Sequence, residues 1–471
     1  MTQPMQEYLA DKNGFFTNVI NQQQADQLAA QKRYEFVAFH HQIIRQEFDL
    51  LSDLLKNVRD EHKRFQLYRD YLKQLLKNYY EAYGNTKERL RLEKSDAAAT
   101  EEHNQPIEHQ PVKKKLMSAL TALMTIPLHT TDIRDALGLI NITRIQIVLC
   151  RLTVKQSLLV ADAYRLLQPL TESIGLGTDI NSMLAILNKP SPLFNALSVT
   201  VPLSRLIINS GLLLKHTLFP SEQETSLSIN ERFTMEMNKR FCDLLNDMVW
   251  TPINAITNYN NYFGLSAFAA SWILAAFLCF DIGLLMYRHH LAYQQYLSNR
   301  SCYLESSRGL VDNEAAFGQR QLAALDQNWQ VMSAVYRFNI TAAALLVSGF
   351  SASLLITVPL LVPLCFFLSA IGVSMYITAP SYGQYYQKWL ELQTCTDDEQ
   401  RQEALHQTSM AKNNFMSNLT KNTLVPMIVM LVIATSLMAA ILIATTYISY
   451  EIAIAIVDDQ SEDIALSVIP S

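Results

Sequence analysis

The stretch that decides the fold runs from Ile340 to Thr378 and reads ITAAALLVSGFSASLLITVPLLVPLCFFLSAIGVSMYIT. It lies within a longer segment, 338–387, that contains no charged side chain. A helix rises about 1.5 Å per residue and a bilayer core is about 30 Å thick, so 39 residues are too many for one crossing. The sequence therefore predicts a membrane protein whose chain turns back within this stretch.

Two prolines mark the expected turn. Pro359 and Pro363 stand close together near the centre of the stretch, and both cannot keep helical hydrogen bonds. We therefore predict a proline-turned helical hairpin with spans over 340–357 and 364–378. Because the turn is itself apolar, two full crossings and a re-entrant hairpin both remain open. Pro359 and Pro363 are candidate functional residues for this reason.

Two further apolar runs complete a predicted multi-pass membrane domain over 262–450. They cover about 262–287 and 424–448, which gives about four spans in all. Small residues around Gly349 and Ala370 have the spacing that lets membrane helices approach closely.

Asp281 is the only ionisable residue that we place well inside a predicted span. A carboxylate within a membrane is by default a candidate ion or proton relay. It lies about two helical turns from Arg288, however, and no second intramembrane acid or base is expected to complete a relay. A small-solute or ion transporter, or a channel component, is therefore an alternative function.

Composition narrows the class of protein. Charged residues make up only 17% of the chain, against about 25% in an average soluble domain. The net charge of -5 argues against nucleic-acid binding. The six cysteines show neither zinc spacing nor a disulfide framework, and no phosphate-loop, zinc-protease or nucleophile-elbow motif is present. We expect no catalytic residue, cofactor or metal, and the second alternative is a membrane enzyme without a recognisable motif.

A heptad repeat dominates the N-terminal region, 1–97. Thirteen of sixteen positions spaced alternately three and four apart are apolar or aromatic: Ala30, Tyr34, Val37, His41, Ile44, Phe48, Leu51, Leu55, Val58, His62, Phe65, Arg69, Leu72, Leu76, Tyr79 and Tyr83. A 3.5-residue repeat of this length predicts a coiled coil that recruits a protein partner or a second copy. The alternative is a long helix packed in an antiparallel bundle.

Three positions of this seam are polar. His41, His62 and Arg69 are candidate functional residues, because single polar residues in a seam can fix register or oligomeric state. A sharper hypothesis makes the two histidines a pH switch, since their protonation would place charge in an apolar seam.

A polar linker, 98–112, leads to a basic helical region, 113–261. Between 113 and 217, eleven Lys or Arg oppose five Asp or Glu, which leaves a net charge of +6. Basic amphipathic helices of this kind can lie on an anionic membrane surface. An ordinary helical bundle is the equal alternative. Within this region, Ser228 and Glu231 have the spacing of a capping box that opens a helix.

The C-terminal tail, 451–471, carries five acids and no base. It resembles the short acidic, serine-containing signals of effectors that intracellular bacterial pathogens deliver through type IV secretion systems. The plan of coiled coil, helical body and late membrane spans is also similar to many such effectors, although no specific family is indicated. The resemblance implies insertion in a host organelle membrane, with a bacterial inner membrane as the other location.

These observations predict an all-α integral membrane protein with an N-terminal coiled coil, a helical middle and a multi-pass helical domain. Its expected partners are the lipid bilayer and a protein, or itself, through the coiled coil. The predicted function is non-enzymatic, membrane-anchored interaction or tethering.

Overall fold

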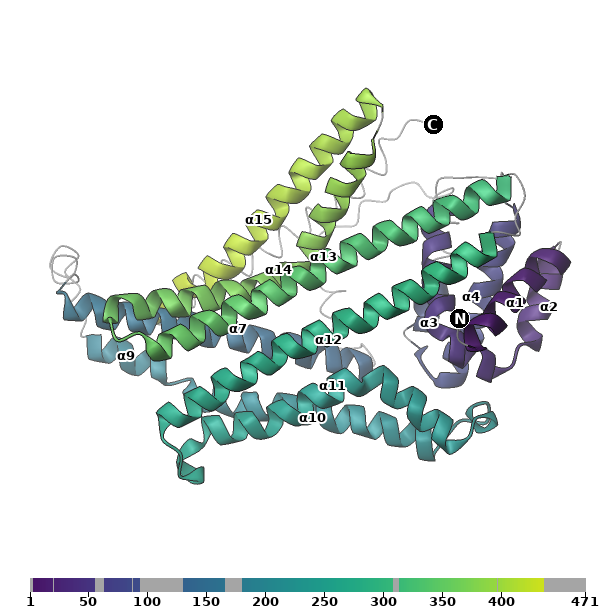
Figure 1. Cartoon of the computed structure of the whole chain (residues 1–471). Coiled ribbons are helices and arrows are strands. Elements are labelled where there is room, and N and C mark those ends of the chain that lie inside the picture. Colours follow the sequence, from purple (N-terminus) through teal and green to yellow (C-terminus); the bar gives the residue numbers. More distant parts are fainter. Residues whose placement is uncertain are drawn as a thin grey trace, which may run out of the picture. The chain divides into compact units, whose positions relative to one another are not determined.

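A computed structural model describes residues 3–19, 21–55, 63–86, 88–93, 130–165, 180–307, 313–395 and 397–435. All regular secondary structure in these ranges is helical, as the sequence predicts (Figure 1). The elements are α1 (Gln3–Asn18), α2 (Gln22–Gln31), α3 (Tyr34–Leu55), α4 (Lys63–Tyr83), α7 (Thr130–Ala163), α9 (Ile180–Asn188), α10 (Ser191–Leu218), η1 (Glu224–Ser226), α11 (Ile229–Asn258), η2 (Asn260–Phe263), α12 (Ala267–Ser307), α13 (Asn313–Leu355), η3 (Pro359–Leu361), α14 (Val362–Thr394) and α15 (Asp398–Thr435).

The chain divides into two compact units, each built from segments that are distant in sequence. The first unit comprises Met1–Leu137, Leu203–Met248 and Tyr287–Ser333. The second comprises Gly138–Pro202, Val249–Met286 and Ala334–Ser471. Helices α7, α10, α11, α12 and α13 each contribute residues to both units.

The first unit has a core rich in aromatic side chains. Its members come from α1 to α4 and from the parts of α12 and α13 in this unit, and include Tyr8, Phe15, Ala25, Ala29, Phe36, Ile44, Leu51, Phe65, Tyr68, Tyr71, Leu72, Leu76, Cys302 and Phe317. The rings of Phe65 and Phe317 lie with their centroids 4.2 Å apart. Aromatic pairs at such distances add stability beyond the area that they bury.

The predicted single coiled-coil rod over 30–83 is wrong. The seam is divided among α2, α3 and α4, and α3 and α4 run antiparallel, because His41 contacts Tyr80 and Glu47 contacts Tyr68. A 3.5-residue repeat occurs in any helix that buries a narrow row of apolar side chains. The repeat is therefore compatible with an antiparallel helix pair as well as with a coiled-coil rod. The structure has an antiparallel packing of helices, as the alternative did, but not the single long helix of that alternative.

In the second unit, α13 and α14 approach so closely that glycine is required. A Cβ atom on Gly349 would lie 2.6 Å from the Cys365 carbonyl oxygen, and one on Gly372 would lie 2.7 Å from the Ala342 carbonyl oxygen. The close packing predicted from the small residues is thus present at Gly349. Between the two helices, Pro359 opens η3 and Pro363 lies in the first turn of α14, where a missing N–H costs little.

Helix α15 packs against α14 in the same unit through an aromatic cluster. Phe415 of α15 lies 5.5 Å from the ring of Tyr382, which in turn stacks 4.3 Å from Phe338 of α13. Gln146 of α7 contacts both of these helices. It donates hydrogen bonds of 2.8 Å to the Ser374 hydroxyl of α14 and to the Asn422 carbonyl of α15. Side-chain hydrogen bonds between apolar helices of this kind help to fix their register.

Six helices in the described part of the chain are long and apolar enough to cross a membrane: Ala136–Ala163, Ile180–Leu218, Ala267–Ser306, Ala316–Leu355, Pro359–Thr394 and Asp398–Ala434. The last four overlap the four spans predicted from the sequence, but the first predicted span begins at 262, before its helix, and the second ends at 357, beyond its helix. Residues 436–448 of the last predicted span lie outside the described residues. The first two fall in the basic region, where the sequence predicted surface helices or a bundle. A count of four spans is therefore too low by the criteria of length and composition.

Candidate functional site

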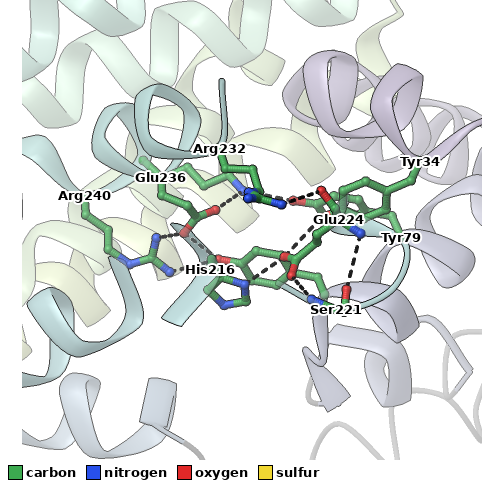
Figure 2. A network of polar contacts seen from close by, with 10 residues as sticks. Tyr34, Tyr79, His216, Ser221, Glu224, Arg232, Glu236 and Arg240 are labelled. Atoms are coloured by element: carbon green, nitrogen blue, oxygen red, sulfur yellow. Dashed lines mark hydrogen bonds and ion pairs between the residues drawn. The ribbon is translucent and has the colours of Figure 1, made fainter. Parts of the chain in front are cut away.

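A network of charged and hydroxyl groups joins α3 and α4 to the turn between α10 and α11 in the first unit (Figure 2). Glu224 of η1 is its first centre. The Glu224 carboxylate lies 2.8 Å from His216 Nδ1, accepts a 2.8 Å hydrogen bond from the Ser221 amide and a 3.4 Å bond from the Tyr34 hydroxyl. Burial by itself would raise the pKa of Glu224, but the bonds from His216 and Ser221 outweigh it and lower that pKa.

Glu236 of α11 is the second centre of the network. Its carboxylate pairs with Lys239 at 2.8 Å and with Arg240, and it accepts a 2.9 Å hydrogen bond from Tyr83 of α4. Burial opposes ionisation, yet Lys239 and Arg240 prevail and the pKa of Glu236 is lowered. The His216 ring stacks on Tyr83 at 4.1 Å, which connects the two centres.

Local sequence explains why α11 begins here. The Ser228 amide donates to Glu231 Oε2 at 2.8 Å, and the Glu231 amide donates to the Ser228 hydroxyl at 3.3 Å. This reciprocal pair confirms the predicted capping box and starts α11 at Ile229. Glu236, Lys239 and Arg240 then follow within three turns, so the cap sets their position opposite α4.

A buried ion pair lies in the core of the same unit. Lys12 Nζ of α1 is 2.5 Å from Glu47 Oε1 of α3, and both side chains are almost wholly buried. Glu47 also accepts hydrogen bonds from Tyr8 and from Gln321, while the Lys12 ammonium lies 4.8 Å from the centre of the Tyr303 ring. Burial, followed by the Glu47 charge, raises the pKa of Tyr8 well above its ordinary value. The Glu47 carboxylate thereby joins α1, α3 and α13, and Lys12 extends the contacts to α12.

The carboxylates of these groups pair with histidine, lysine and arginine side chains of the same unit. Within the described ranges, no three His, Cys, Asp or Glu side chains are arranged to hold a metal ion. Charge pairs in such surroundings fix the arrangement of helices, because removal of either partner leaves a buried charge uncompensated.

Asp281, the predicted intramembrane carboxylate, lies in the second unit on α12. It accepts a 2.7 Å hydrogen bond from the indole Nε1 of Trp250 on α11. Tryptophan N–H groups usually find such a partner when they are away from water.

The predicted seam residues have different surroundings. His41 is mostly buried, with Nε2 3.0 Å from the Tyr80 hydroxyl, and burial followed by the charges of Lys239 and Arg45 lowers its pKa to about 4. Its imidazole is therefore neutral at physiological pH. Arg69 pairs with the adjacent Asp70 at 2.6 Å, with its side chain 33% exposed, so it lies at the edge of the core. His62 lies outside the described residues.

Three bases of α7 lie in a candidate span that the sequence did not predict. Arg144, Arg151 and Lys155 lie in the candidate span Ala136–Ala163, so Asp281 is not the only ionisable residue within a span. Arg151 Nη1 donates to the Ser191 hydroxyl at 2.8 Å and to the Leu187 carbonyl at 3.4 Å, which caps the C-terminal end of α9. The spacing of seven and four residues, which places all three bases on one face of a helix, was the available signal.

The fold and the six apolar helices define an all-helical, multi-pass integral membrane protein. Comparison with protein-family models, with curated proteins and with solved structures gives no match for this chain.

Proposed function

We propose that this chain is a membrane-anchored interaction protein that acts without catalysis. The network around Glu224 and Glu236 carries the proposal, because it joins the α3–α4 pair to the start of α11 through buried charges. A joint of this kind fixes the helices of the first unit against one another. A unit held together in this way, in a chain with membrane-spanning helices, is suited to presenting a surface beside a membrane.

The partner, another protein or a second copy, would bind the outside of the first unit. The predicted coiled-coil seam cannot serve, because its apolar members, such as Ile44 and Leu72, are buried in the core of this unit. Deletion of 30–83 would therefore remove the core together with any binding surface. The informative variant weakens the joint and leaves the membrane helices intact.

Cross-linking of the full chain in its native membrane, followed by mass spectrometry, tests this proposal. In Glu236→Ala, loss of the carboxylate leaves Arg240 buried without its partner, and we expect recovery of the cross-linked partner to fall at least tenfold. Asp281→Asn is the matched control in the second unit and should leave recovery unchanged. Both variants should stay in the membrane during an alkaline wash. Equal recovery from Glu236→Ala and the wild type would contradict the proposal.

Transport is the second candidate, and the Trp250–Asp281 hydrogen bond in a candidate span is the observation that favours it. The test is flux of protons or small ions into liposomes that contain the purified chain. A flux that disappears in Asp281→Asn, with normal insertion, would favour transport over interaction.

Delivery into a host cell is a further part of the proposal and rests on the resemblance of the tail to type IV secretion signals. The tail, 451–471, lies outside the described residues. A translocation reporter fused to the N-terminus should enter host cells with the intact chain. It should fail to enter when 451–471 are removed. Entry in both cases would overturn this part alone.

A further inference from the structure

In the first unit, the part of α10 from Leu203 to Leu214 carries its polar side chains inside and its apolar ones outside. Ile207 is 63% exposed and Leu214 is 53% exposed, whereas Asn209 is fully buried. Arg205 is also turned inward, where its guanidinium meets a carboxylate of α11. A helix on the surface of a water-soluble domain has the opposite arrangement.

The neighbouring part of α11 shows the same reversal between Phe241 and Met248. Met248 is 58% exposed and Phe241 is 40% exposed. Asp247, one residue before Met248, is fully buried and lies 3.3 Å from Nε of Arg205. The exposed side chains at either end of this stretch are thus large and apolar, while its most deeply buried side chain is a carboxylate.

The charges of this stretch of α11 are matched by bases on the adjacent helices. Asp247 pairs with Arg205 of α10, and Asp243 pairs with Arg288 of α12 at 2.7 Å. Each carboxylate therefore meets one guanidinium, so the stretch presents little net charge. Paired charges are the form in which ionisable side chains are tolerated away from water.

Helix α11 is absent from the six apolar helices because hydropathy averages over all faces of a helix. Its charged residues lower the average even where they point inward. The Arg205–Asp247 ion pair nevertheless places this part of α11 beside α10, which belongs to the candidate span Ile180–Leu218. Exposure by face, and not composition by segment, is the quantity that decides whether a helix faces lipid.

We propose that residues 241–248 of α11 lie in the bilayer beside α10, with Phe241 and Met248 in contact with lipid acyl chains. The occupant of this face is lipid because the face lies beside a candidate span and its charges are neutralised on the inner side. The inference does not depend on whether the first unit binds a partner. It adds a membrane-embedded segment with a charged inner side to the six apolar helices.

A photo-cross-linking experiment with the full chain tests the lipid contact. Benzoylphenylalanine replaces Phe241 or Met248, and the protein is reconstituted in vesicles of phosphatidylcholine and phosphatidylglycerol that include a tagged phosphatidylcholine. Asn238 is the matched control, because it is an exposed polar residue of α11 about 15 Å from Met248 along the helix axis. We expect at least five times more tagged lipid on positions 241 and 248 than on position 238.

Two results would overturn the inference. One is equal lipid labelling at positions 238, 241 and 248. The other is cross-linking of positions 241 and 248 to a second copy of the chain in place of lipid. Two separate positions on α11 keep the test decisive if one substitution disturbs folding, and resistance to an alkaline wash identifies the variants that inserted.

Discussion

The two units pack their interiors by different means. The first unit buries aromatic rings together with full charges, as at Lys12 and Glu47. The second brings α13 and α14 into backbone contact at Gly349 and Gly372. In water, burial of large apolar side chains stabilises a core, and paired charges can select one arrangement. Between apolar helices in lipid the hydrophobic effect does not favour association, so close van der Waals contact must stabilise their packing.

The largest effect is expected from Glu47→Ala in the first unit. The substitution leaves Lys12 charged and buried, and the loss of such a partner costs about 3–5 kcal/mol. Urea-dependent proteolysis of the purified full chain measures the free energy of unfolding of this unit. The double variant Lys12→Met with Glu47→Met is the control and should lose less, because no lone charge remains. A greater loss in the double variant would show that charge pairing is not what holds this core.

A smaller effect is expected from Gly372→Ala in the second unit. A methyl group there would lie 2.7 Å from the Ala342 carbonyl oxygen and 2.9 Å from the Leu346 amide nitrogen, so α13 and α14 must separate. Overpacking of this kind costs about 1–3 kcal/mol. The thermal unfolding midpoint in detergent should fall. Gly283→Ala on α12 is the control, since no atom lies within 4 Å of the added Cβ. Equal midpoints for the two variants would contradict the account of close contact.

Protonation of His41 at low pH should change the free energy of unfolding by no more than the Gly372→Ala substitution does. Its folded pKa of about 4 lies below the ordinary value of 6.5, so between these values the unfolded chain binds a proton that the folded chain excludes. The free energy of unfolding therefore falls as pH drops from 6.5 toward 4, by on the order of 1–3 kcal/mol from this group. His41→Gln should remove this part of the pH dependence. Parallel curves for wild type and variant would mean that His41 is solvated.

The smallest effect is expected from Arg69→Leu. Arg69 and Asp70 form a partly exposed pair, and such pairs contribute about 0–1 kcal/mol. A coiled-coil rod would instead gain an apolar seam residue at this position and associate more strongly. Sedimentation of the detergent-solubilised protein distinguishes the two outcomes. Tighter self-association would favour a coiled-coil rod over the antiparallel bundle. Unchanged self-association would support the antiparallel bundle.

Local sequence patterns predicted where helices form better than they predicted which helices pack against each other. The capping box at Ser228 and the apolar stretch at 340–378 depend on residues near one another in sequence, and both correspond to the described helices. The seam over 30–83 predicted helices but not their reversal, because an identical repeat suits either arrangement.

The joint around Glu224 and Glu236 was not predictable from the sequence. Tyr83 and Glu236 are separated by 153 residues, and neither residue type in isolation indicates a partner. The burial of Asp247 could not be predicted for a related reason. Sequence periodicity separates the faces of a helix, but it does not show which face packs against the rest of the protein. Arg151 is different, because its regular spacing from Arg144 and Lys155 was visible in a region predicted to form either surface helices or a bundle.

The aromatic core of the first unit has a practical consequence for spectroscopy. The chain has four tryptophans, Trp250, Trp272, Trp329 and Trp389, and none of them lies in α1 to α4. Those four helices instead hold tyrosines, including Tyr8, Tyr68 and Tyr71 at the centre of the core. Melting of α1 to α4 should therefore register in tyrosine absorbance, whereas indole emission reports on other helices. Two optical signals from one sample can thus follow separate parts of a single polypeptide.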